Sequence, residues 1–405
     1  MIEEHTKELA AYCLSCPVPR CETGCPVHNH IRDYIKAVKE DDMARAREIL
    51  YGVNPFPQLT CRLCDYARQC QGHCVRAIRS VPVEIHALEM AISDSGFDET
   101  VSGSANLHRI AMIGAGPANL AAAKYLVRRG FHVEVYEALD EIGGAIFSGI
   151  PSYRFDKSYL QEIHNDLARA GVKFHFGTMV GRDVSLEELL KEYDRILAGI
   201  GARSENTYGL QGDGCKAGLS LLYDLNVLHL QEEYRTKYRH AVVWGGGNVA
   251  MDCARSLIRL MDDVTVIYRR SEKEMPANHD EIEDAKKEGV KFAFLENIKS
   301  LSLDEQGRVT GVHAVKMHLG EPDDSGRARP IETVGSDYEI VCDLVVPAIG
   351  QKVDFAPLDG LHTTASHLSD HERVYVCGDA YLGPKTVAAA IHDGIEAARE
   401  IEASF

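Results

Sequence analysis

The chain has 405 residues, of which 45% are apolar and 26% charged, and its formal net charge is −17. This length predicts about two to four domains with sizeable cores, and the composition is that of a soluble globular protein. The acidic balance and the lack of a basic stripe argue against a nucleic-acid partner. Since the sequence shows no apolar run long enough to span a membrane and starts with acidic residues, no membrane association and a cytoplasmic location are expected.

The first hundred residues contain two groups of cysteines. The first is Cys13, Cys16, Cys21 and Cys25, followed directly by Pro26, and the second is Cys61, Cys64, Cys70 and Cys74. Without a secretory leader, metal ligation is favoured over disulfides. The spacing departs from the paired knuckles of zinc sites and, with its Cys-Pro ending, favours two cubane iron–sulfur clusters. Zinc, disulfides and free thiols are the alternatives. An amphipathic helical stretch, roughly Ile31 to Leu50, separates the groups.

The stretch from Arg109 to Glu137 has the pattern of one βαβ unit. An apolar strand turns through Gly114-Ala115-Gly116-Pro117-Ala118-Asn119 into an alanine-rich helix ending at Gly130, and the next strand ends on Glu137. Gly114 permits a tight turn, Gly116 lets backbone N–H groups approach a pyrophosphate, and Glu137 would bind a ribose. The pattern predicts a dinucleotide site at Gly114, Gly116, Pro117, Ala118 and Glu137, an unliganded βαβ turn being the alternative.

Two neighbouring features refine this expectation. Asn119 stands where a small residue is usual, so slightly looser packing of helix on strand is expected. Gly143 and Gly144 follow the unit and would let the backbone approach the same pyrophosphate, unless they form a simple loop.

A second βαβ unit is expected after residues 158–200, which alternate between helix and strand and lead to Gly201. Its strand from Ala241 to Trp244 leads into a glycine turn and a helix, and the next strand ends on Arg269-Arg270. An acid at that position binds a ribose hydroxyl, whereas an arginine pair suits a 2′-phosphate. The pattern therefore favours NADPH over NADH, a solvated strand end being the alternative. The candidate residues are Gly245, Gly247, Asn248, Val249, Ala250, Arg269 and Arg270.

The last hundred residues combine a β-rich insertion with the end of the first nucleotide site. Residues 300–340 alternate polar and apolar positions, which predicts a short antiparallel excursion. A strand then leads to Gly350, and the strand from Val374 to Cys377 is followed by Gly378-Asp379 and a final helix opened by Lys385, Thr386 and Val387. A carboxylate beside a helix N-terminus would hold a ribityl chain and the edge of a flavin ring. FAD is therefore the expected ligand of the first unit.

These motifs, in this order, resemble one family over nearly the whole chain: the small subunit of glutamate synthase and its relatives. The relatives include the electron-input half of dihydropyrimidine dehydrogenase and the large subunit of the ferredoxin-dependent transhydrogenase. The stretches that carry the resemblance are Cys21-Glu-Thr-Gly-Cys-Pro-Val-His-Asn, Asn54-Pro-Phe-Pro, Gly114-Ala-Gly-Pro-Ala, Gly149-Ile-Pro, Gly245-Gly-Gly-Asn-Val-Ala-Met-Asp, Tyr268-Arg-Arg and Cys377-Gly-Asp.

The resemblance implies an α/β protein with a helical iron–sulfur domain over residues 1–104. Two Rossmann-like three-layer domains follow, an FAD domain over 105–203 and 341–405 and an NAD(P)H domain inserted at 204–340. It also implies that Cys13, Cys16, Cys21 and Cys74 hold one 4Fe–4S cluster, and that Cys25, Cys64, Cys70 and a side chain near Glu89 hold the other. Cys61 departs from the family pattern. It would either take no part in binding the cluster or replace the side chain near Glu89 as the fourth ligand.

The expected activity is the entry of electrons from NAD(P)H. A hydride would pass to FAD, which splits the pair into single electrons for the clusters. Arg154, which follows Gly149-Ile-Pro, is the candidate for a catalytic cation near the flavin ring, with a surface salt bridge as the alternative. Hydride transfer requires no side-chain general base.

Because the chain ends soon after the expected flavin site, electrons are expected to leave to a catalytic partner subunit or a ferredoxin-like carrier. The sequence does not indicate an oligomeric state. Two other functions fit some of the pattern. A zinc-stabilised redox-sensing or assembly flavoprotein would lack turnover, and a disulfide reductase would need paired cysteines where Cys215, Cys253, Cys342 and Cys377 stand singly.

Overall fold

The computed structural model describes residues 2–96, 106–323 and 326–405. Two compact units form within it. The first comprises Met1–Gly144, Phe155–Ala202 and Val353–Phe405, and the second comprises Ala145–Arg154 and Arg203–Lys352. The Ser-, Gly-, Asp- and Thr-rich stretch over residues 93–107 predicts a linker. Most of it, residues 97–105, lies outside the described part of the chain.

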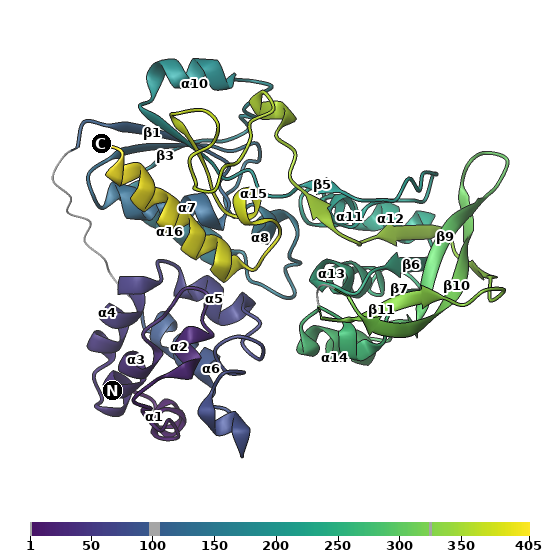
Figure 1. Ribbon diagram of the computed structural model, residues 1–405, viewed down its shortest axis with the longest axis horizontal. Helices are drawn as coiled ribbons and strands as arrows, with labels where there is room; N and C mark the ends of the chain where they lie inside the picture. The colour runs from purple at the N-terminus through teal and green to yellow at the C-terminus, as the bar shows by residue number, and fades with distance from the viewer. Residues whose placement is uncertain (1, 97–105, 324–325) are drawn as a thin grey trace. The chain divides into compact units, whose positions relative to one another are not determined.

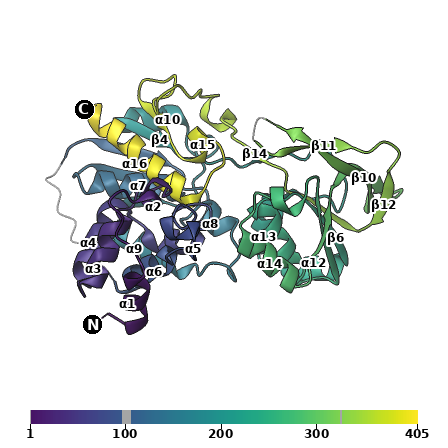
Figure 2. The ribbon, with the colours of Figure 1, turned by 60° about the horizontal axis from the view of Figure 1, so that its bottom comes forward.

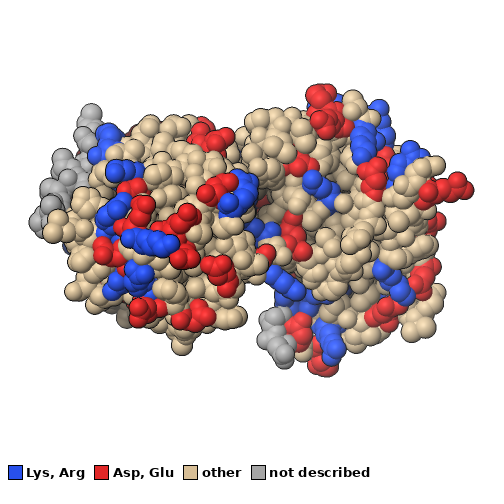
Figure 3. All heavy atoms as spheres, turned by 90° about the horizontal axis from the view of Figure 1, so that it is seen from above, with Lys and Arg blue, Asp and Glu red and all other residues tan. Residues whose placement is uncertain are grey.

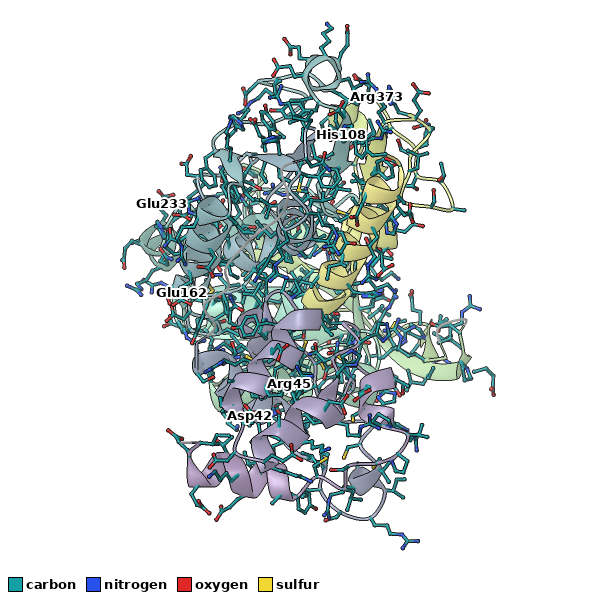
Figure 4. All side chains as sticks on the ribbon, turned by 90° about the vertical axis from the view of Figure 1, so that its left-hand side faces the viewer. Asp42, Arg45, His108, Glu162, Glu233 and Arg373 are labelled. Carbon is teal, nitrogen blue, oxygen red and sulfur yellow. The ribbon has the colours of Figure 1, made fainter. Side chains whose placement is uncertain are left out.

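The N-terminal part of the first unit is helical (Figures 1 and 2). Asp42 begins one helix by accepting a hydrogen bond from the Arg45 N–H at 2.9 Å, and both residues lie on the N-terminal helices in Figure 4. The predicted stretch from Ile31 to Leu50 forms two helices, because Asp41 takes a left-handed conformation with φ of 61° between them. The elements are α1 (Glu4–Ala11), α2 (Arg20–Thr23), α3 (Ile31–Lys39), α4 (Met43–Val53), α5 (Pro57–Leu63), η1 (Val75–Ile78) and α6 (Ile85–Asp94).

A parallel sheet organises the rest of the first unit, in the order β15-β4-β1-β2-β3. Its strands are β1 (Arg109–Ile113), β2 (His132–Tyr136), β3 (Lys173–His175), β4 (Arg195–Ala198) and β15 (Val374–Val376). The helices are α7 (Pro117–Val127), α9 (Ser158–Arg169), α10 (Leu186–Glu192), η3 (Ala356–Leu358), α15 (Asp379–Leu382) and α16 (Val387–Ala403). Helices α7 and α16 lie side by side (Figure 1), so closely that a Cβ on Gly394 would meet the Ala118 carbonyl oxygen at 2.0 Å.

The second unit contains a four-stranded parallel sheet, in the order β13-β6-β7-β8. The strands are β6 (His240–Trp244), β7 (Asp263–Tyr268), β8 (Lys291–Phe294) and β13 (Leu344–Pro347). Its helices are α8 (Ala145–Ser148), α11 (Gly218–Asn226), α12 (Gln231–Lys237), α13 (Asn248–Leu257), η2 (Glu272–Glu274) and α14 (His279–Lys287). Apolar side chains from α11, α13 and the sheet, among them Leu222, Met251 and Val266, form one buried core.

The β-rich insertion predicted over residues 300–340 is an antiparallel sheet in which β10 pairs with three partners. It consists of β9 (Glu296–Leu303), β10 (Val309–Pro322), β11 (Ala328–Glu332) and β12 (Tyr338–Val341). A small ladder of β5 (Ser204–Glu205) and β14 (Gln351–Lys352) closes the second unit. On the face in Figure 3, Lys and Arg lie interspersed with Asp and Glu. In the described residues, no helix has the length and apolar character needed to cross a membrane.

Candidate functional site

The first glycine turn lies at the carboxyl end of β1, where a parallel sheet presents its ligand-binding edge. Gly114 has a φ of +94°, and a Cβ there would meet the Gly199 carbonyl oxygen at 2.7 Å, so only glycine fits. Gly116 has open space beside it, which leaves the start of α7 accessible to a ligand. Pro117 and Ala118 are the first residues of α7, whose free N–H groups and dipole favour an anion.

A second pair of glycines packs against this turn. The Gly143 N–H donates to the Ala115 carbonyl at 2.8 Å, and a Cβ on Gly144 would lie 3.0 Å from the Gly116 Cα. Glu137 is buried beside them and accepts hydrogen bonds from the backbone N–H groups of Ala115, at 2.6 Å, and Leu139, at 2.9 Å. The turn is therefore a cradle of backbone with one carboxylate at its side, which fits the pyrophosphate and ribose of a dinucleotide.

Asn119 packs tightly, contrary to the looser contact expected from sequence. It is fully buried and donates from Nδ2 to the carbonyls of Ile113, at 2.9 Å, and Gly114, at 2.7 Å, while its Oδ1 accepts from the Cys377 thiol at 3.1 Å. Its amide thus occupies the space of a small residue and ties the end of β1 to the end of β15.

The turn after β15 brings the C-terminal candidates to the same edge of the sheet. Gly378 has a φ of +65° and donates its N–H to Asp393 on α16 at 2.6 Å. The Asp379 carboxylate accepts from the Lys385 N–H at 3.1 Å, and burial raises its pKa to about 6. Thr386 caps α16 by accepting from the Ala389 N–H at 3.2 Å, and Val387 begins that helix. Gly201, with φ of +70°, follows β4 at this edge.

His367 and Asp393 form a support for this turn that sequence reasoning missed. The imidazole Nε2 lies 3.1 Å from Asp393 Oδ1, and Nδ1 lies 2.8 Å from Glu400 Oε1. Although burial acts to lower the pKa of His367, the two carboxylates raise it overall. Asp393 therefore connects the imidazole of His367 to the backbone of Gly378.

The second glycine turn, in the second unit, repeats the features of the first. Gly245 has a φ of +151°, and a Cβ there would meet the Ala348 carbonyl oxygen at 2.3 Å. Gly247 has open space beside it at the start of α13, whose first residues are Asn248, Val249 and Ala250. The Asn248 Oδ1 accepts from the Asn278 N–H at 2.9 Å, which fixes the loop facing the helix start. Gly350, with φ of +128°, also lies in this unit.

The structure separates the two arginines at the end of β7. Arg270 is 3% exposed, pairs with Asp323 and donates from Nε to the Ala328 carbonyl at 2.8 Å. Arg269 is exposed, and the described residues provide no hydrogen-bond or ion-pair partner for its guanidinium. Arg269 is thus the member of the pair that is available to a phosphate.

Arg154 belongs to the second unit and is held by two carboxylates there. Its Nη1 donates to Asp252 Oδ2 at 2.7 Å, and its Nε donates to Glu281 Oε1 at 2.8 Å. Burial raises the pKa of Asp252 to about 6, which Arg154 opposes. The alternative of a salt bridge is thus observed, although the bridge is buried rather than at the surface. The role of Arg154 near a flavin stays a prediction.

The cysteines of the N-terminal domain lie in two separate groups. Cys13, Cys16, Cys21 and Cys74 line a hollow that is open at its mouth, and Arg20, Arg32 and Arg76 line it as well. Burial raises the pKa of the Cys21 thiol to about 12, with Glu22, Cys74 and Cys13 adding to the effect. The two halves of the cysteine module, far apart in sequence, therefore meet around one cavity.

The second group consists of Cys25, Cys64 and Cys70 around the buried carboxyl of Glu89. Burial raises the pKa of each of these thiols, to about 11 for Cys25, and Glu89 adds to the effect at all three. Burial likewise raises the pKa of Glu89 to about 7. Its Oε1 accepts from the Thr60 hydroxyl at 2.5 Å and from the Asn54 amide at 3.4 Å. Thr60 and Asn54 are thus supports that the cysteine spacing alone does not reveal.

Cys61 lies beside this group rather than within it. Its thiol is buried and accepts a hydrogen bond from Arg62 Nη1 at 3.0 Å. Its charged neighbours are Glu89, Arg62 and Asp94, and Cys64 is the member of the group that interacts with it. The carboxyl of Glu89, in contrast, interacts with all three thiols.

One buried hydroxyl supports the fit of a sulfur-rich cofactor here. Tyr34 on α3 is fully buried, and its hydroxyl has no hydrogen-bond partner among the described residues. It lies within electrostatic range of Cys21 in the first group and of Cys25 and Cys70 in the second. An acceptor between the thiols would satisfy this donor. The described residues contain no group of three or more His, Cys, Asp or Glu close enough for a single metal ion.

The second group of cysteines lies against the flavin-type part of the first unit. The Cys25 carbonyl accepts from the His28 N–H at 3.0 Å, and the His28 ring contacts His392 of α16 edge-on, with ring centroids 4.9 Å apart. Lys124 of α7 donates to the Pro55 carbonyl at 3.0 Å, next to α5. The buried group is therefore the one nearer α7 and α16, and the open hollow is the outer one.

The fold and these sites define an oxidoreductase that combines a nucleotide-binding Rossmann pair with an iron–sulfur module. Residues 1–101 match dihydropyrimidine dehydrogenase domain II with its 4Fe–4S cluster, and residues 108–394 match the pyridine nucleotide-disulphide oxidoreductases. The glutamate synthase (NADPH) small chain of Azospirillum brasilense is 34% identical over 433 residues, covering 99% of this chain and 89% of that one. The small chain from Escherichia coli is 33% identical over 98% of this chain and 90% of that one.

The chain belongs to the glutamate synthase small chain family within the pyridine nucleotide-disulphide oxidoreductases. The fold class, the oxidoreductase class and the cofactors FAD, NAD(P)H and 4Fe–4S expected from the sequence are thereby confirmed, and the number of clusters stays a prediction.

Other relatives are longer. The NADPH-Fe(3+) oxidoreductase subunit beta of Geobacter sulfurreducens is 35% identical over 94% of this chain, which spans 63% of that protein. Mycobacterium tuberculosis FprA in complex with NADPH has a TM-score of 0.65 and 19% identity, covering 74% of this chain and 84% of that one. At this identity the likeness shows the shared fold alone.

Proposed function

We propose that the chain oxidises NADPH and passes single electrons through two 4Fe–4S clusters to a partner protein. The observation that carries the proposal is the division of the cysteines into a buried group beside α7 and α16 and an open group at a hollow. Cys25, Cys64, Cys70 and Glu89 would hold the inner cluster, and Cys13, Cys16, Cys21 and Cys74 the outer one. FAD, when bound, supplies the step from two-electron to one-electron chemistry.

The tasks of the chain's own residues are binding and positioning. The turns at Gly114 and Gly245 present backbone N–H groups to the two pyrophosphates. Glu137 binds a ribose of the flavin nucleotide, and Arg269 binds the 2′-phosphate that distinguishes NADPH from NADH. The buried support of Asp393 and His367 holds the Gly378 turn, and with it Asp379, against the ribityl chain.

The exit for electrons is at the outer cluster. Its hollow is open and lined by Arg20, Arg32 and Arg76, of which Arg32 pairs with Asp33 at 3.0 Å. The exposed apolar side chains Leu14, Val18, Ile78 and Val81 flank it in sequence, at 56%, 74%, 66% and 68% exposure. A positively charged rim around apolar contacts suits an acidic redox protein. The named relatives include small and beta subunits, which supports a partner subunit or a ferredoxin-like carrier.

An anaerobic titration tests the proposal. The purified holoprotein should contain about eight irons per FAD, and NADPH should bleach both the flavin bands and the iron–sulfur shoulder. Dithionite added afterwards then gives the fraction of clusters that NADPH had left oxidised. Zinc in place of iron, or a flavin that NADPH leaves oxidised, would contradict the proposal and favour the non-catalytic alternative.

A further inference from the structure

The starting point is the phenol of Tyr34, which is a buried donor without an acceptor. Tyr34 lies on α3, has no exposed surface, and its hydroxyl has no partner among the described residues. A buried hydroxyl that loses its hydrogen bonds to water and gains no other partner costs folding free energy, so native proteins rarely retain one. Phenylalanine would fill the same space without that cost.

The position of the phenol indicates which acceptor it would meet. Its charged and titratable neighbours are Glu89, Cys70 and Cys25 of the inner group and Cys21 of the outer group. Cys70 and Cys21 also lie within electrostatic range of each other. On the same helix, Ile31 and Ile35 line the hollow of the outer group. Tyr34 therefore lies within electrostatic range of both sets of thiols, with more of its neighbours in the inner one.

We propose that the Tyr34 hydroxyl donates a hydrogen bond to a sulfur of the inner cluster and raises the reduction potential of that cluster. This inference rests on the proposed function, since it requires a cluster at Cys25, Cys64 and Cys70. A hydrogen bond to a cluster sulfur stabilises the more negative, reduced state and so raises the potential. Tyr34 is therefore a positioning residue: by raising the potential of the inner cluster, it shifts the distribution of the electron between the two clusters toward the inner one.

The role differs from that of Thr60 and Asn54, which hold Glu89 through its Oε1. Those residues orient a candidate ligand, whereas Tyr34 has no partner to orient among the described residues. The cluster would supply the acceptor that the Tyr34 hydroxyl lacks among the described residues. Removing the hydroxyl should therefore change the cluster's potential without changing its ligands.

The test compares Tyr34→Phe with the parent holoprotein in a potentiometric titration followed by electron paramagnetic resonance, with dithionite and mediators as the reductant. We expect full iron content and a lower potential of the inner cluster, shifting the electron's distribution between clusters roughly tenfold, or about 59 mV for a one-electron couple. Resonance Raman spectra in D₂O should show a shift of iron–sulfur modes in the parent that the variant lacks.

Tyr12→Phe is the matched control. Tyr12 lies in the same domain, but its hydroxyl is already paired, with Ser80 Oγ at 3.1 Å and the Val81 carbonyl at 3.2 Å. This variant should leave the potential of the inner cluster unchanged. If Tyr34→Phe keeps its iron, raises the melting temperature and leaves both potentials unchanged, the hydroxyl is not bonded to a cluster and the inference is overturned.

The same measurements separate this inference from the proposed function. Because dithionite reduces the clusters directly, the shift in potential does not depend on NADPH. Iron present with no shift overturns the role of Tyr34 alone. A shift in potential without bleaching by NADPH supports Tyr34 and contradicts the proposed donor. A parent protein without iron overturns both.

Discussion

Arg154 and Asp252 form a forked ion pair, in which Arg154 Nη1 lies 2.8 and 2.7 Å from the two carboxylate oxygens. The pair fastens the short segment Ala145–Arg154 to α13, because Asp252 lies on that helix. Both residues belong to the second unit. Tyr153 adds to this attachment through its ring, over which the Arg259 guanidinium lies at 3.8 Å. Asn226 donates to the Ser148 carbonyl at 3.1 Å at the other end of the segment.

Replacing Arg154 with Gln should lower the free energy of unfolding by about 3 kcal/mol, because the buried Asp252 would lose its forked partner, while Glu281 would keep only its pair with Arg255. Calorimetry of the apo and the flavin-loaded protein measures this loss. Arg182→Gln, which removes an exposed pair with Asp183, is the control and should cost little. A variant that is as stable as the parent but has a shifted flavin potential would instead support Arg154 as a cation at the flavin.

The two arginines after β7 should have different roles. Arg269→Gln should raise the KM for NADPH roughly tenfold and leave that for NADH unchanged, because a forked contact to a 2′-phosphate is lost. Arg270→Gln should mainly lower the melting temperature, since it breaks a buried pair with Asp323. Steady-state kinetics with both donors and an artificial acceptor distinguish the two variants. Equal losses with both donors for Arg269→Gln would refute the 2′-phosphate assignment.

Iron analysis of two neighbouring cysteine variants tests the ligand groups. Cys64→Ser should lose about one cluster's worth of iron, because Cys64 lies within electrostatic range of Cys25, Cys70 and Glu89. Cys61→Ser should retain its iron, because its thiol accepts from Arg62. The more informative result would be iron loss in Cys61→Ser together with full iron in Glu89→Ala, since that would make Cys61 the fourth ligand.

The stability of the flavin turn should depend on pH through His367. The pKa of His367 in the folded protein is raised above its usual 6.5, since the hydrogen bonds to Asp393 and Glu400 outweigh burial. The stabilisation is therefore complete below about pH 6.5 and is lost as the pH rises through the higher folded-state value. The parent's melting temperature should fall over that alkaline range more steeply than that of His367→Gln. Parallel profiles for the two proteins would contradict this.

Electron exit at the outer hollow should depend on charge. With a plant-type ferredoxin as an acidic probe, the rate of NADPH-driven reduction should fall as salt rises. Arg20→Gln with Arg76→Gln, both at residues that line the hollow, should reduce the low-salt rate roughly three- to tenfold. Arg45→Gln is the matched control, since Arg45 is exposed on α4 and pairs with Glu48 (Figure 4). Equal rates for the double variant and the control would place the exit elsewhere.

Much of the fold could be predicted from sequence because its signals are local. The glycine turns, the strand that precedes each and the acid or arginine that follows are close in sequence, so β1, α7, β2 and β6, α13, β7 were expected within a few residues of where they lie. The helix–strand alternation of residues 158–200 is likewise confirmed as α9, β3, α10 and β4.

The features that sequence reasoning missed depend on partners far apart in the chain. Arg154 is held by Asp252 and Glu281, which no local pattern connects to it. The separation of Arg269 from Arg270 had a usable signal, since successive residues at a strand end face opposite sides of the sheet. Asn119 was misjudged by size alone, because its hydrogen bonds to two strand-end carbonyls compensate for the larger side chain.

The two units exchange chain at Gly144, Arg154, Ala202 and Lys352, and this division sets the order in which they can fold during synthesis. The second unit has all its residues once Lys352 has left the ribosome. The sheet of the first unit still lacks β15, and α7 still lacks its neighbour α16, until the last fifty or so residues follow. The second unit is therefore expected to fold before the first, although the first unit begins earlier in the sequence. A ribosome stalled just after Lys352 has emerged from it would display the second unit folded and the sheet of the first unit unfinished.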